Sequence, residues 1–481
     1  MGVSLNPSTI LSGQGIDVSS LVQQIISEQS GQLSVWQGEQ TTLATQNGLL
    51  EGINNNLTNL QSAVAALADP AGALTAQAAT SSQPGIVTAT ASSSAVNGTH
   101  QIVVTSLATA GTLYSDPVTG GANTSFLASG QTSGDIQLSV GGTTRDIAIT
   151  AGSNDTLTTL ASYINTQSTA NGWGVTASVV SDGSGSRLSL QSQTSGTGGA
   201  LATGSNSNTT LAFDAPVGGT NAALTIDGVP FTSSSNTVTG AIQGVTLNLL
   251  SQSPGTPVQL TVGPDTSQIT NAVNNFVSAY NTLVSTINTQ YVVDPTGSVP
   301  APPLESDISL RSLQSRILSD ASYAIGGNSG FVNLASLGIN TNNDGTLSVG
   351  TNASGQTFAQ VVAANPSAVQ SFFQNSSGTG FANNFNTDLT ALTDPTQGPL
   401  YVDLTQNQAE QSDLTTTINN FETQLTTEQT QLTQQYDAVN ASLQSYPLLL
   451  QEVTETLGTL GSSTSGSGAT TSAGPTLTSG L

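Results

Sequence analysis

The strongest constraint on this chain is a stripe of apolar residues near its N-terminal end. Its members are separated by steps of 3, 4, 3, 4 and 3: Leu50, Ile53, Leu57, Leu60, Val64 and Leu67. This spacing places all six side chains on one face of an α-helix, as in a coiled coil. We expect the helix to begin at a cap formed by Asp17 or Ser19. It should end at Asp69-Pro70, because proline cannot continue a helix.

A second stripe lies near the other end of the chain, with steps of 4, 3, 4 and 7: Leu414, Ile418, Phe421, Leu425 and Leu432. The same rhythm continues toward Leu460, and Pro447 should kink or divide that helix. Each stripe needs a partner to bury its seam, and the nearest candidate is the other stripe. We therefore expect the two ends to meet, with the middle of the chain inserted between them. Two separate helical hairpins are the alternative.

Between the stripes the apolar residues alternate with polar ones, which is typical of strands. The expected strands, hairpins and small β unit cover residues 80–90, 100–105, 136–140 with 146–150, 175–180 with 187–191, and 224–249. A short helix is expected at 157–165, and further helices at 265–290 and near 308–318. The predicted fold class is therefore α+β and multidomain, with terminal helical coiled-coil or bundle legs and inserted β-rich head domains.

Charged residues are unusually scarce, and most of them are acidic. Only 7% of residues are charged, the net charge is -24, and the four cations are all arginines. Nucleic acids and anionic membrane surfaces need clustered cations, so both are excluded as partners. The chain has no cysteine, so it has no disulfide or thiolate chemistry. Its start does not read as a cleaved signal peptide, and no apolar run predicts membrane insertion.

The residues offer little for catalysis or metal binding. His100 is the only histidine, and on a predicted strand next to a turn it reads as an edge residue. The acids are scattered, without a pair that suggests hydrolysis. Asn340, Asn342 and Asp344 begin like a calcium loop, but Thr351 stands where a bidentate glutamate is needed. We interpret residues 343–345 as a hairpin turn, and we expect no enzyme activity, no cofactor and no metal.

Six segments, each weak alone, resemble in their order the flagellar hook-associated protein 2 family, which caps the flagellar filament. They are Gly15–Val22, Thr80–Ser92, Leu157–Asn165 with Val175–Ala177, Ser186–Leu190, Ala223–Leu247, and Leu337–Phe373. Together they cover nearly the whole chain. The helices of relatives usually carry more Lys, Arg and Glu than the helices of this chain.

The resemblance implies an extracellular protein at the distal tip of the bacterial flagellum. Members are exported through the flagellar type III apparatus with a dedicated chaperone. They assemble as a ring of identical subunits, commonly a pentamer, and contact flagellin and the hook–filament junction proteins. Their terminal helices act as legs on the growing tip, and their β domains form the plate that closes the channel. The cap promotes flagellin folding and polymerisation and prevents the loss of subunits.

Combined with the sequence pattern, the resemblance implies a division into four parts. These are terminal docking segments, a helical leg domain, a β-rich head domain, and an inserted head domain with a short helix: 1–42 plus 440–481, 43–75 plus 264–439, 76–118 plus 210–263, and 119–209. The two stripes would form the coiled-coil core of the leg. The candidates for docking on the filament are Ile16, Asp17, Val18, Leu21, Val22, Ile26, Leu450, Val453 and Leu457.

Two other functions remain open from the sequence. One is an extracellular adhesin whose β domains bind host mucin or glycans. The other is a different hook–filament junction or filament protein, because similar β–helix–β units occur in flagellin and in other hook-associated proteins.

Overall fold

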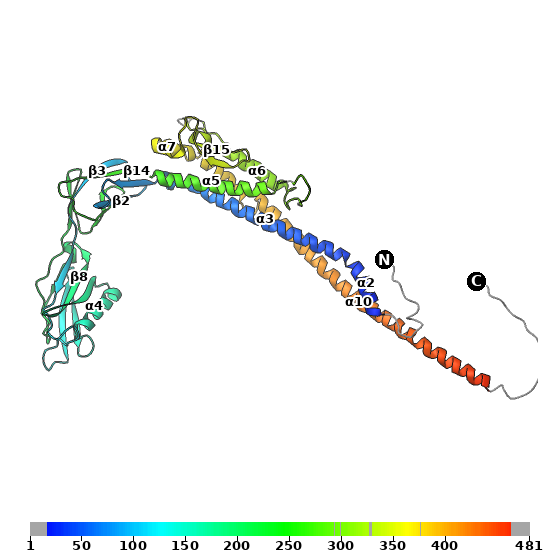
Figure 1. Ribbon diagram of the computed structural model, residues 1–481. Coiled ribbons are helices and arrows are strands. Elements are labelled where there is room, and N and C mark those ends of the chain that lie inside the picture. The colour runs from blue at the N-terminus through cyan, green and yellow to red at the C-terminus, as the bar shows by residue number, and fades with distance from the viewer. Residues whose placement is uncertain (1–16, 293, 299, 327–329, 376, 463–481) are drawn as a thin grey trace, which may run out of the picture. The chain divides into compact units, whose positions relative to one another are not determined.

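The computed structural model describes residues 17–292, 294–298, 300–326, 330–375 and 377–462 (Figure 1). The chain divides into two compact units. The first contains the described residues up to Thr58, Leu283–Ile317, and those from Leu389 onward. The second contains Asn59–Thr282 and Leu318–Asp388.

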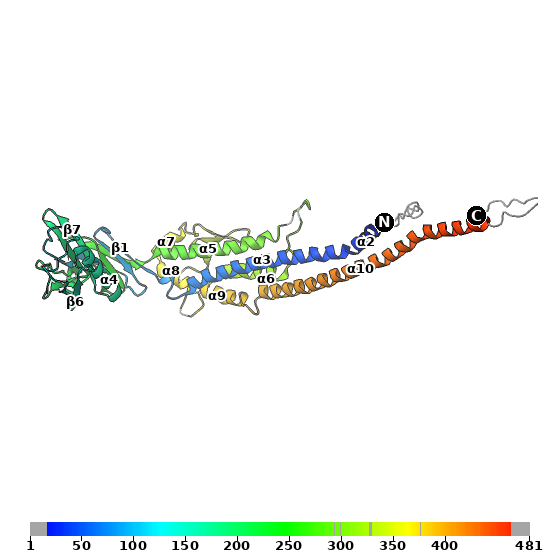
Figure 2. The ribbon, with the colours of Figure 1, turned by 90° about the horizontal axis from the view of Figure 1, so that it is seen from below.

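Long helices make up most of the first unit. They are α2 (Val18–Gln29), most of α3 (Gly31–Ala68), most of α6 (Ile308–Ala321) and α10 (Pro399–Ser462). Figures 1 and 2 both show α2 and the start of α3 running beside α10. The predicted cap is confirmed, because the Asp17 carboxylate accepts a hydrogen bond from the Ser20 amide at 3.1 Å. Pro447 does not divide α10, contrary to one of the two expectations for it, and the helix continues through that residue.

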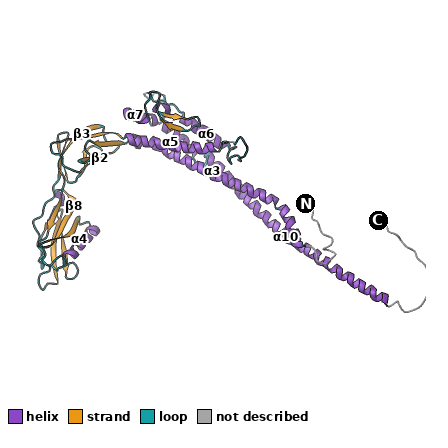
Figure 3. Ribbon diagram, in the orientation of Figure 1, coloured by secondary structure: helices purple, strands orange, loops and turns teal. Residues whose placement is uncertain are grey.

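The second unit contains two β domains with separate cores. In the first, a five-stranded sheet faces a three-stranded one, and neighbouring strands are antiparallel (Figure 3). The sheet orders are β1 (Gln77–Ser81), β14 (Val258–Pro264), β3 (Gly98–Ser106), β10 (Ala222–Ile226) and β11 (Val229–Ser233), and then β12 (Thr237–Ile242), β13 (Val245–Leu249) and β2 (Val87–Ala91). In β10 every second side chain is buried, so its alternating pattern directs Ala222, Leu224 and Ile226 into the core.

The outer β domain pairs two three-stranded sheets and one helix. The elements, in sheet order, are β4 (Ala110–Tyr114), β8 (Gly185–Ser195) and β7 (Val175–Asp182), then β6 (Thr143–Thr150), β5 (Ser133–Val140) and β9 (Leu201–Thr203), with α4 (Leu157–Asn171) packed on β7. Both hairpins predicted from alternation and turn residues are confirmed. The predicted short helix is also confirmed, and Thr156 and Thr159 form a capping box at its start.

The single strand expected at residues 80–90 is wrong. The structure has two strands there, β1 and β2, and they belong to different sheets. Pro84 and Gly85 form a turn between them. Proline has no N–H for a strand ladder, and glycine weakens a strand interior, so the break follows from the sequence. The chain passes between the two β cores twice. It leaves the first core between Ala108 and Leu113, and it returns to that core between Phe213 and Ala222.

The remaining helices of the second unit surround a cluster of phenylalanine rings. Alternation and heptads did not predict three short helices of this region, of which the last two supply most of these rings: α7 (Phe358–Ala364), α8 (Pro366–Phe373) and α9 (Phe381–Leu392). The long helix α5 (Thr266–Thr289), which was predicted, supplies Phe276. Its ring lies 5.9 Å from that of Phe381 and 6.1 Å from that of Phe385.

A small hairpin packs on α5. Its strands are β15 (Ile339–Thr341) and β16 (Leu347–Val349), as predicted around the 343–345 turn. The Asp344 carboxylate accepts hydrogen bonds from Thr346 and therefore stabilises the turn. The Tyr280 hydroxyl donates to the Gly345 carbonyl at 3.2 Å, and burial raises the pKa of that hydroxyl far above its usual range. The described residues also include three short 3₁₀ turns: Ala73–Thr75, Thr197–Gly199 and Leu334–Leu337.

Asn236 connects two parts of the first β domain that lie far apart in sequence. Its Oδ1 accepts a hydrogen bond from the Ala108 amide at 2.7 Å, and its Nδ2 donates to the Ala108 carbonyl at 3.0 Å. Asn236→Ala should lower the free energy of unfolding of this domain by about 2 kcal/mol, because two partly buried backbone groups lose their partners. Thermal unfolding of the full chain measures this. The control is Asn248→Ala, which removes one exposed bond to Thr237. Equal effects of the two changes would contradict the prediction.

Candidate functional site

The helical unit is an antiparallel pair formed by the two ends of the chain. Several direct contacts join the α2–α3 segment to α10. The Gln29 amide donates to Glu428 at 2.8 Å, and the Gln40 amide donates to the Thr415 hydroxyl at 2.7 Å. Between them the rings of Trp36 and Phe421 meet edge to face at 5.3 Å. The prediction that the chain ends meet is confirmed by these contacts.

The same contacts show which segments face each other. As the residue number rises along α2 and α3, the number of the contacting residue in α10 falls by a similar amount, from the Gln29–Glu428 contact to the Asn47–Gln411 hydrogen bond. This is the register of an antiparallel helix pair. The C-terminal stripe, Leu414–Leu432, therefore lies opposite about residues 25–43 and not opposite the Leu50–Leu67 stripe. Ile418 and Leu425 are buried, and Leu414, Phe421 and Leu432 are half-buried. The expectation that the two stripes pack on each other needs this correction.

The N-terminal stripe has other neighbours. All six of its side chains are fully buried. Within the first unit, the Asn56 amide donates to the Thr286 hydroxyl of α5 at 3.2 Å. Within the second unit, the Gln374 amide donates to the Leu67 carbonyl at 3.3 Å. Heptad spacing identified the buried face of α3, but it could not identify the partner, because α5 carries an equally good apolar face.

The candidate docking residues fall into two groups that the structure does not bring together. Those at the N-terminal end belong to α2: Val18 and Val22 are buried, and Leu21 and Ile26 are half-buried. Asp17 caps that helix, and the hydrogen bond from the Ser20 amide lowers the pKa of its carboxyl group. Ile16 lies outside the described residues. Because α2 packs on α10, its apolar face is already partly covered.

The C-terminal group lies on the last part of α10 and is open to solvent. Leu450 is 64% exposed, Val453 is 53% exposed and Leu457 is 63% exposed. Tyr446, Leu448 and Leu449 are exposed beside them. Together they form an exposed apolar surface on this part of α10. No described residue shields these side chains strongly from solvent.

The surface of α10 is polar but carries little charge. Threonine hydroxyls along it donate to the carbonyl four residues earlier, as Thr415, Thr416 and Thr417 do. The hydrogen bonds from Gln29, Gln40 and Asn47 to α10 have a neutral amide as donor, and only that of Gln29 has a carboxylate as acceptor. A typical neutral hydrogen bond contributes only about 1 kcal/mol net. The packing of α10 on the N-terminal helices therefore depends largely on apolar contacts such as that between Trp36 and Phe421.

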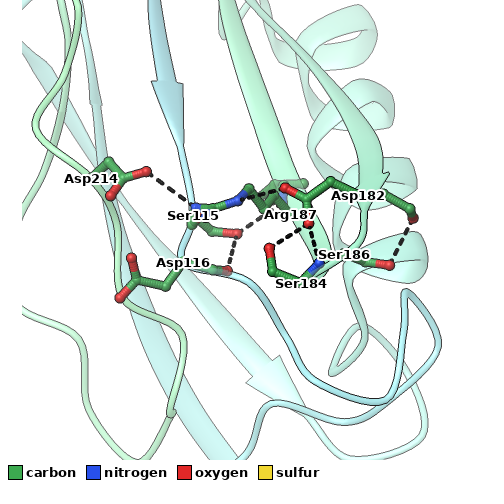
Figure 4. A network of polar contacts seen from close by, with 9 residues as sticks. Ser115, Asp116, Asp182, Ser184, Ser186, Arg187 and Asp214 are labelled. Atoms are coloured by element: carbon green, nitrogen blue, oxygen red, sulfur yellow. Dashed lines mark hydrogen bonds and ion pairs between the residues drawn. The ribbon is translucent and has the colours of Figure 1, made fainter.

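In the outer β domain, Arg187 holds three segments together (Figure 4). Its Nη1 donates to the Ser115 carbonyl at 3.0 Å and lies 3.3 Å from an Asp214 oxygen. Its Nε lies 3.6 Å from an Asp182 oxygen. Hydrogen bonds from Ser184, with a smaller contribution from Arg187, lower the pKa of Asp182. The network fixes the ends of β4 and β7 to the segment that leaves the domain, so its role is structural.

His100 lies on β3 and pairs with Asp227, a contact that the sequence did not predict. Its Nδ1 is 2.7 Å from an Asp227 oxygen, and the other oxygen accepts the Gln101 amide at 2.8 Å. Asp227 and Gly228 both have positive φ, so they form the two-residue turn between β10 and β11. The pair lies at the rim of an open cavity of about 500 Å³. Val229, Phe231 and Ile242 form part of its apolar wall.

None of the helices among the described residues has the length and hydropathy needed to cross a lipid bilayer. No group of three or more His, Asp or Glu side chains in the same residues is arranged to hold a metal ion.

Comparison with known proteins identifies the family. Residues 14–111 match the model of the flagellar hook-associated protein 2 N-terminus, and residues 219–446 match that of its C-terminus. The B-type flagellar hook-associated protein 2 of Pseudomonas aeruginosa is 31% identical over 388 residues, which are 75% of this chain and 79% of that protein. The chain belongs to the flagellar hook-associated protein 2 family.

Further comparisons agree with the assignment. The structure of this chain is similar to that of the D1-D2-D3 domains of the flagellar cap protein FliD from Escherichia coli. The TM-score is 0.57 at 26% identity, with 75% of this chain and 99% of that chain covered. The flagellar hook-associated protein 2 of Salmonella typhimurium is 34% identical over 26% of this chain and 27% of its own length. Residues 135–194 match the flagellin hook IN motif. These relatives give the adhesin alternative no support.

The buried face of α3 gives a direct test of the helical core. Leu57→Asp combined with Leu60→Asp should abolish the leg fold, because two carboxylates would replace fully buried leucines. Circular dichroism would then show a large loss of helix. The matched control is Asn55→Asp with Asn59→Asp, which adds the same charge at exposed positions of α3. Unchanged helix content in the leucine variant would show that this face is not the core.

The Asp227 carboxylate should make the stability of the first β domain depend on pH. The hydrogen bond from the Gln101 amide, and then that from His100, lower its pKa in the folded state. This stabilisation is present above about pH 4, the usual value for an aspartate, and is lost as pH falls through the lowered pKa. The difference in thermal midpoint between the natural chain and Asp227→Asn should shrink between pH 7 and pH 3. A constant difference would contradict the prediction.

Proposed function

We propose that this protein is the cap of a flagellar filament. It would assemble outside the cell at the distal tip as a ring of identical subunits, with a pentamer favoured. There it promotes the folding and polymerisation of arriving flagellin and prevents exported subunits from escaping. The observation that carries the proposal is the match to the hook-associated protein 2 models at both ends, together with a structural likeness to a solved flagellar cap protein.

The helical legs supply the contact with the filament. The exposed apolar end of α10 around Leu450, Val453 and Leu457 docks on flagellin, and on the hook–filament junction proteins before a filament exists. The residues of α2 fix the base of this surface by packing on α10. In the four-part division proposed from the sequence, both belong to the terminal docking segments, and the β domains form the plate.

The cap works mechanically, with no enzyme activity and no cofactor. It must hold the tip firmly and still release it when a subunit adds. The low charge of the α10 surface suits this task, because few ion pairs fix one position and each neutral hydrogen bond contributes little. Apolar contacts then provide most of the attraction, and these are not directional.

Export places a further demand on the chain. A protein that crosses the flagellar type III apparatus unfolded must avoid covalent cross-links on the way. The chain has no cysteine, so it cannot form a disulfide at any stage. A dedicated export chaperone would cover its apolar helix faces before export.

The function is tested by deleting the gene. The mutant should make hooks without filaments and release monomeric flagellin into the medium, because nothing holds exported subunits at the tip. Complementation with a Leu450→Asp, Val453→Asp, Leu457→Asp variant should fail to retain flagellin. A Gln451→Asp, Thr454→Asp variant changes exposed polar positions of the same helix and should succeed. Normal filaments without leakage in the deletion strain would overturn the proposal.

A further inference from the structure

A cation and two aromatic rings form a surface cluster in the outer β domain, separate from the Arg187 network. The Arg145 guanidinium of β6 lies over the Trp173 ring, with its Cζ 5.6 Å from the ring centroid. The Tyr163 ring of α4 meets Trp173 edge to face at 6.2 Å. All three side chains are half-buried, so each packs on the domain and still presents atoms to solvent. We call Arg145, Tyr163 and Trp173 the basic cluster.

The guanidinium of the basic cluster is available to a partner. In the part of the chain that the structure describes, Arg145 makes no ion pair, and its recorded hydrogen bond is to the Thr143 carbonyl at 3.3 Å. An arginine stacked on an aromatic ring is held in position and keeps edge N–H groups free for a carboxylate. Arginine, tryptophan and tyrosine are also the residues most enriched at the centres of protein interfaces.

The complementary surface lies at the other end of the same domain. Figure 4 shows the Asp116 carboxylate beside the Arg187 network without a dashed contact. Its side chain is exposed, and no ion pair to it is found among the described residues. Asp182 and Asp214 share Arg187, and Asp116 beside them adds an unpaired carboxylate, so this end carries a net negative charge. We call these three carboxylates the acidic end.

The distance between the two surfaces prevents them from meeting within one chain. Strand β8 runs from the acidic end to the basic cluster. Arg187 contacts the acidic end, and the backbone N–H of Gln193 donates to the carbonyl of Gly174, the residue after Trp173. Six residues of strand separate these positions, or about 20 Å. Two different surfaces of opposite charge on one domain can satisfy each other only between copies, in a head-to-tail contact. Such a contact closes into a ring when the rotation between neighbours allows it.

We propose that the basic cluster binds the acidic end of the outer β domain in a second copy of this chain, with Arg145 facing Asp116. Copies of a chain with a net charge of -24 repel each other. The contact would offset part of this repulsion, because it places one of the four cations where two copies meet. The inference rests on the proposed ring, and it names the contact that joins neighbouring β domains.

Charge exchange tests the contact in the full-length chain. Arg145→Asp and Asp116→Arg should each shift assemblies toward monomer in sedimentation velocity, because like charges would then face each other. The double variant should restore assembly, since the pair is re-formed with its signs exchanged. Arg311→Asp is the matched control, because Arg311 lies over the Tyr291 ring at 5.5 Å in the other unit. Unchanged assembly of Arg145→Asp, or no rescue by the double variant, overturns the proposal.

Cross-linking tests the same contact when assembly is weak. The chain has no cysteine, so Thr143→Cys and Thr119→Cys place single thiols at the basic cluster and at the acidic end without removing a charged residue. With a short bis-maleimide reagent, the double variant should give a ladder of covalent oligomers, whereas each single variant gives dimers at most. Absence of the ladder overturns the contact. If the natural chain forms no assembly in sedimentation velocity, that result argues instead against the ring of the proposed function.

Discussion

The helical part of this protein depends on one interaction, the antiparallel packing of the chain's two ends. The Trp36–Phe421 contact and the hydrogen bonds on either side of it fix α2 and the start of α3 against α10. The part of the chain between these segments must therefore begin and end at the same pair of helices. The β domains can be inserted there because an insertion that starts and ends close together need not disturb the packing that holds its ends.

Much of this arrangement could be predicted from the sequence, because the signals were periodic and local. The steps of three and four identified the buried face of α3, and alternation with Gly-rich turns identified the hairpins β5–β6 and β7–β8. Partners were harder to predict. The stripe at Leu50–Leu67 matched Leu414–Leu432 as well as any other apolar face, and only the register of the folded pair showed that about residues 25–43 lie opposite the second stripe. The short helices α7 to α9 carry too few turns for a clear period, although their phenylalanines build a core.

In the candidate site, too, only the parts with a periodic and local signal could be predicted from the sequence. The exposed leucines at the end of α10 were found from the sequence because they continue a heptad, and the structure adds that they are open to solvent. The His100–Asp227 pair and the Arg145–Trp173 stack were not found. Each joins residues from strands, turns or helices far apart in sequence, and no spacing rule links them. The family comparison supplied what neither periodicity nor geometry could, which is the biological setting of the fold.

The distribution of arginine has a consequence for survival outside the cell. Proteases of the trypsin class cut after lysine or arginine, and this chain offers them four positions. Arg145 lies in β6, Arg187 lies in β8, and Arg311 and Arg316 lie in α6. A protease needs an extended, accessible segment, so each cut requires local unfolding of a strand or helix first. The protein should therefore resist trypsin-like digestion as long as it stays folded, and the rate of cleavage at each arginine would report how often that element opens.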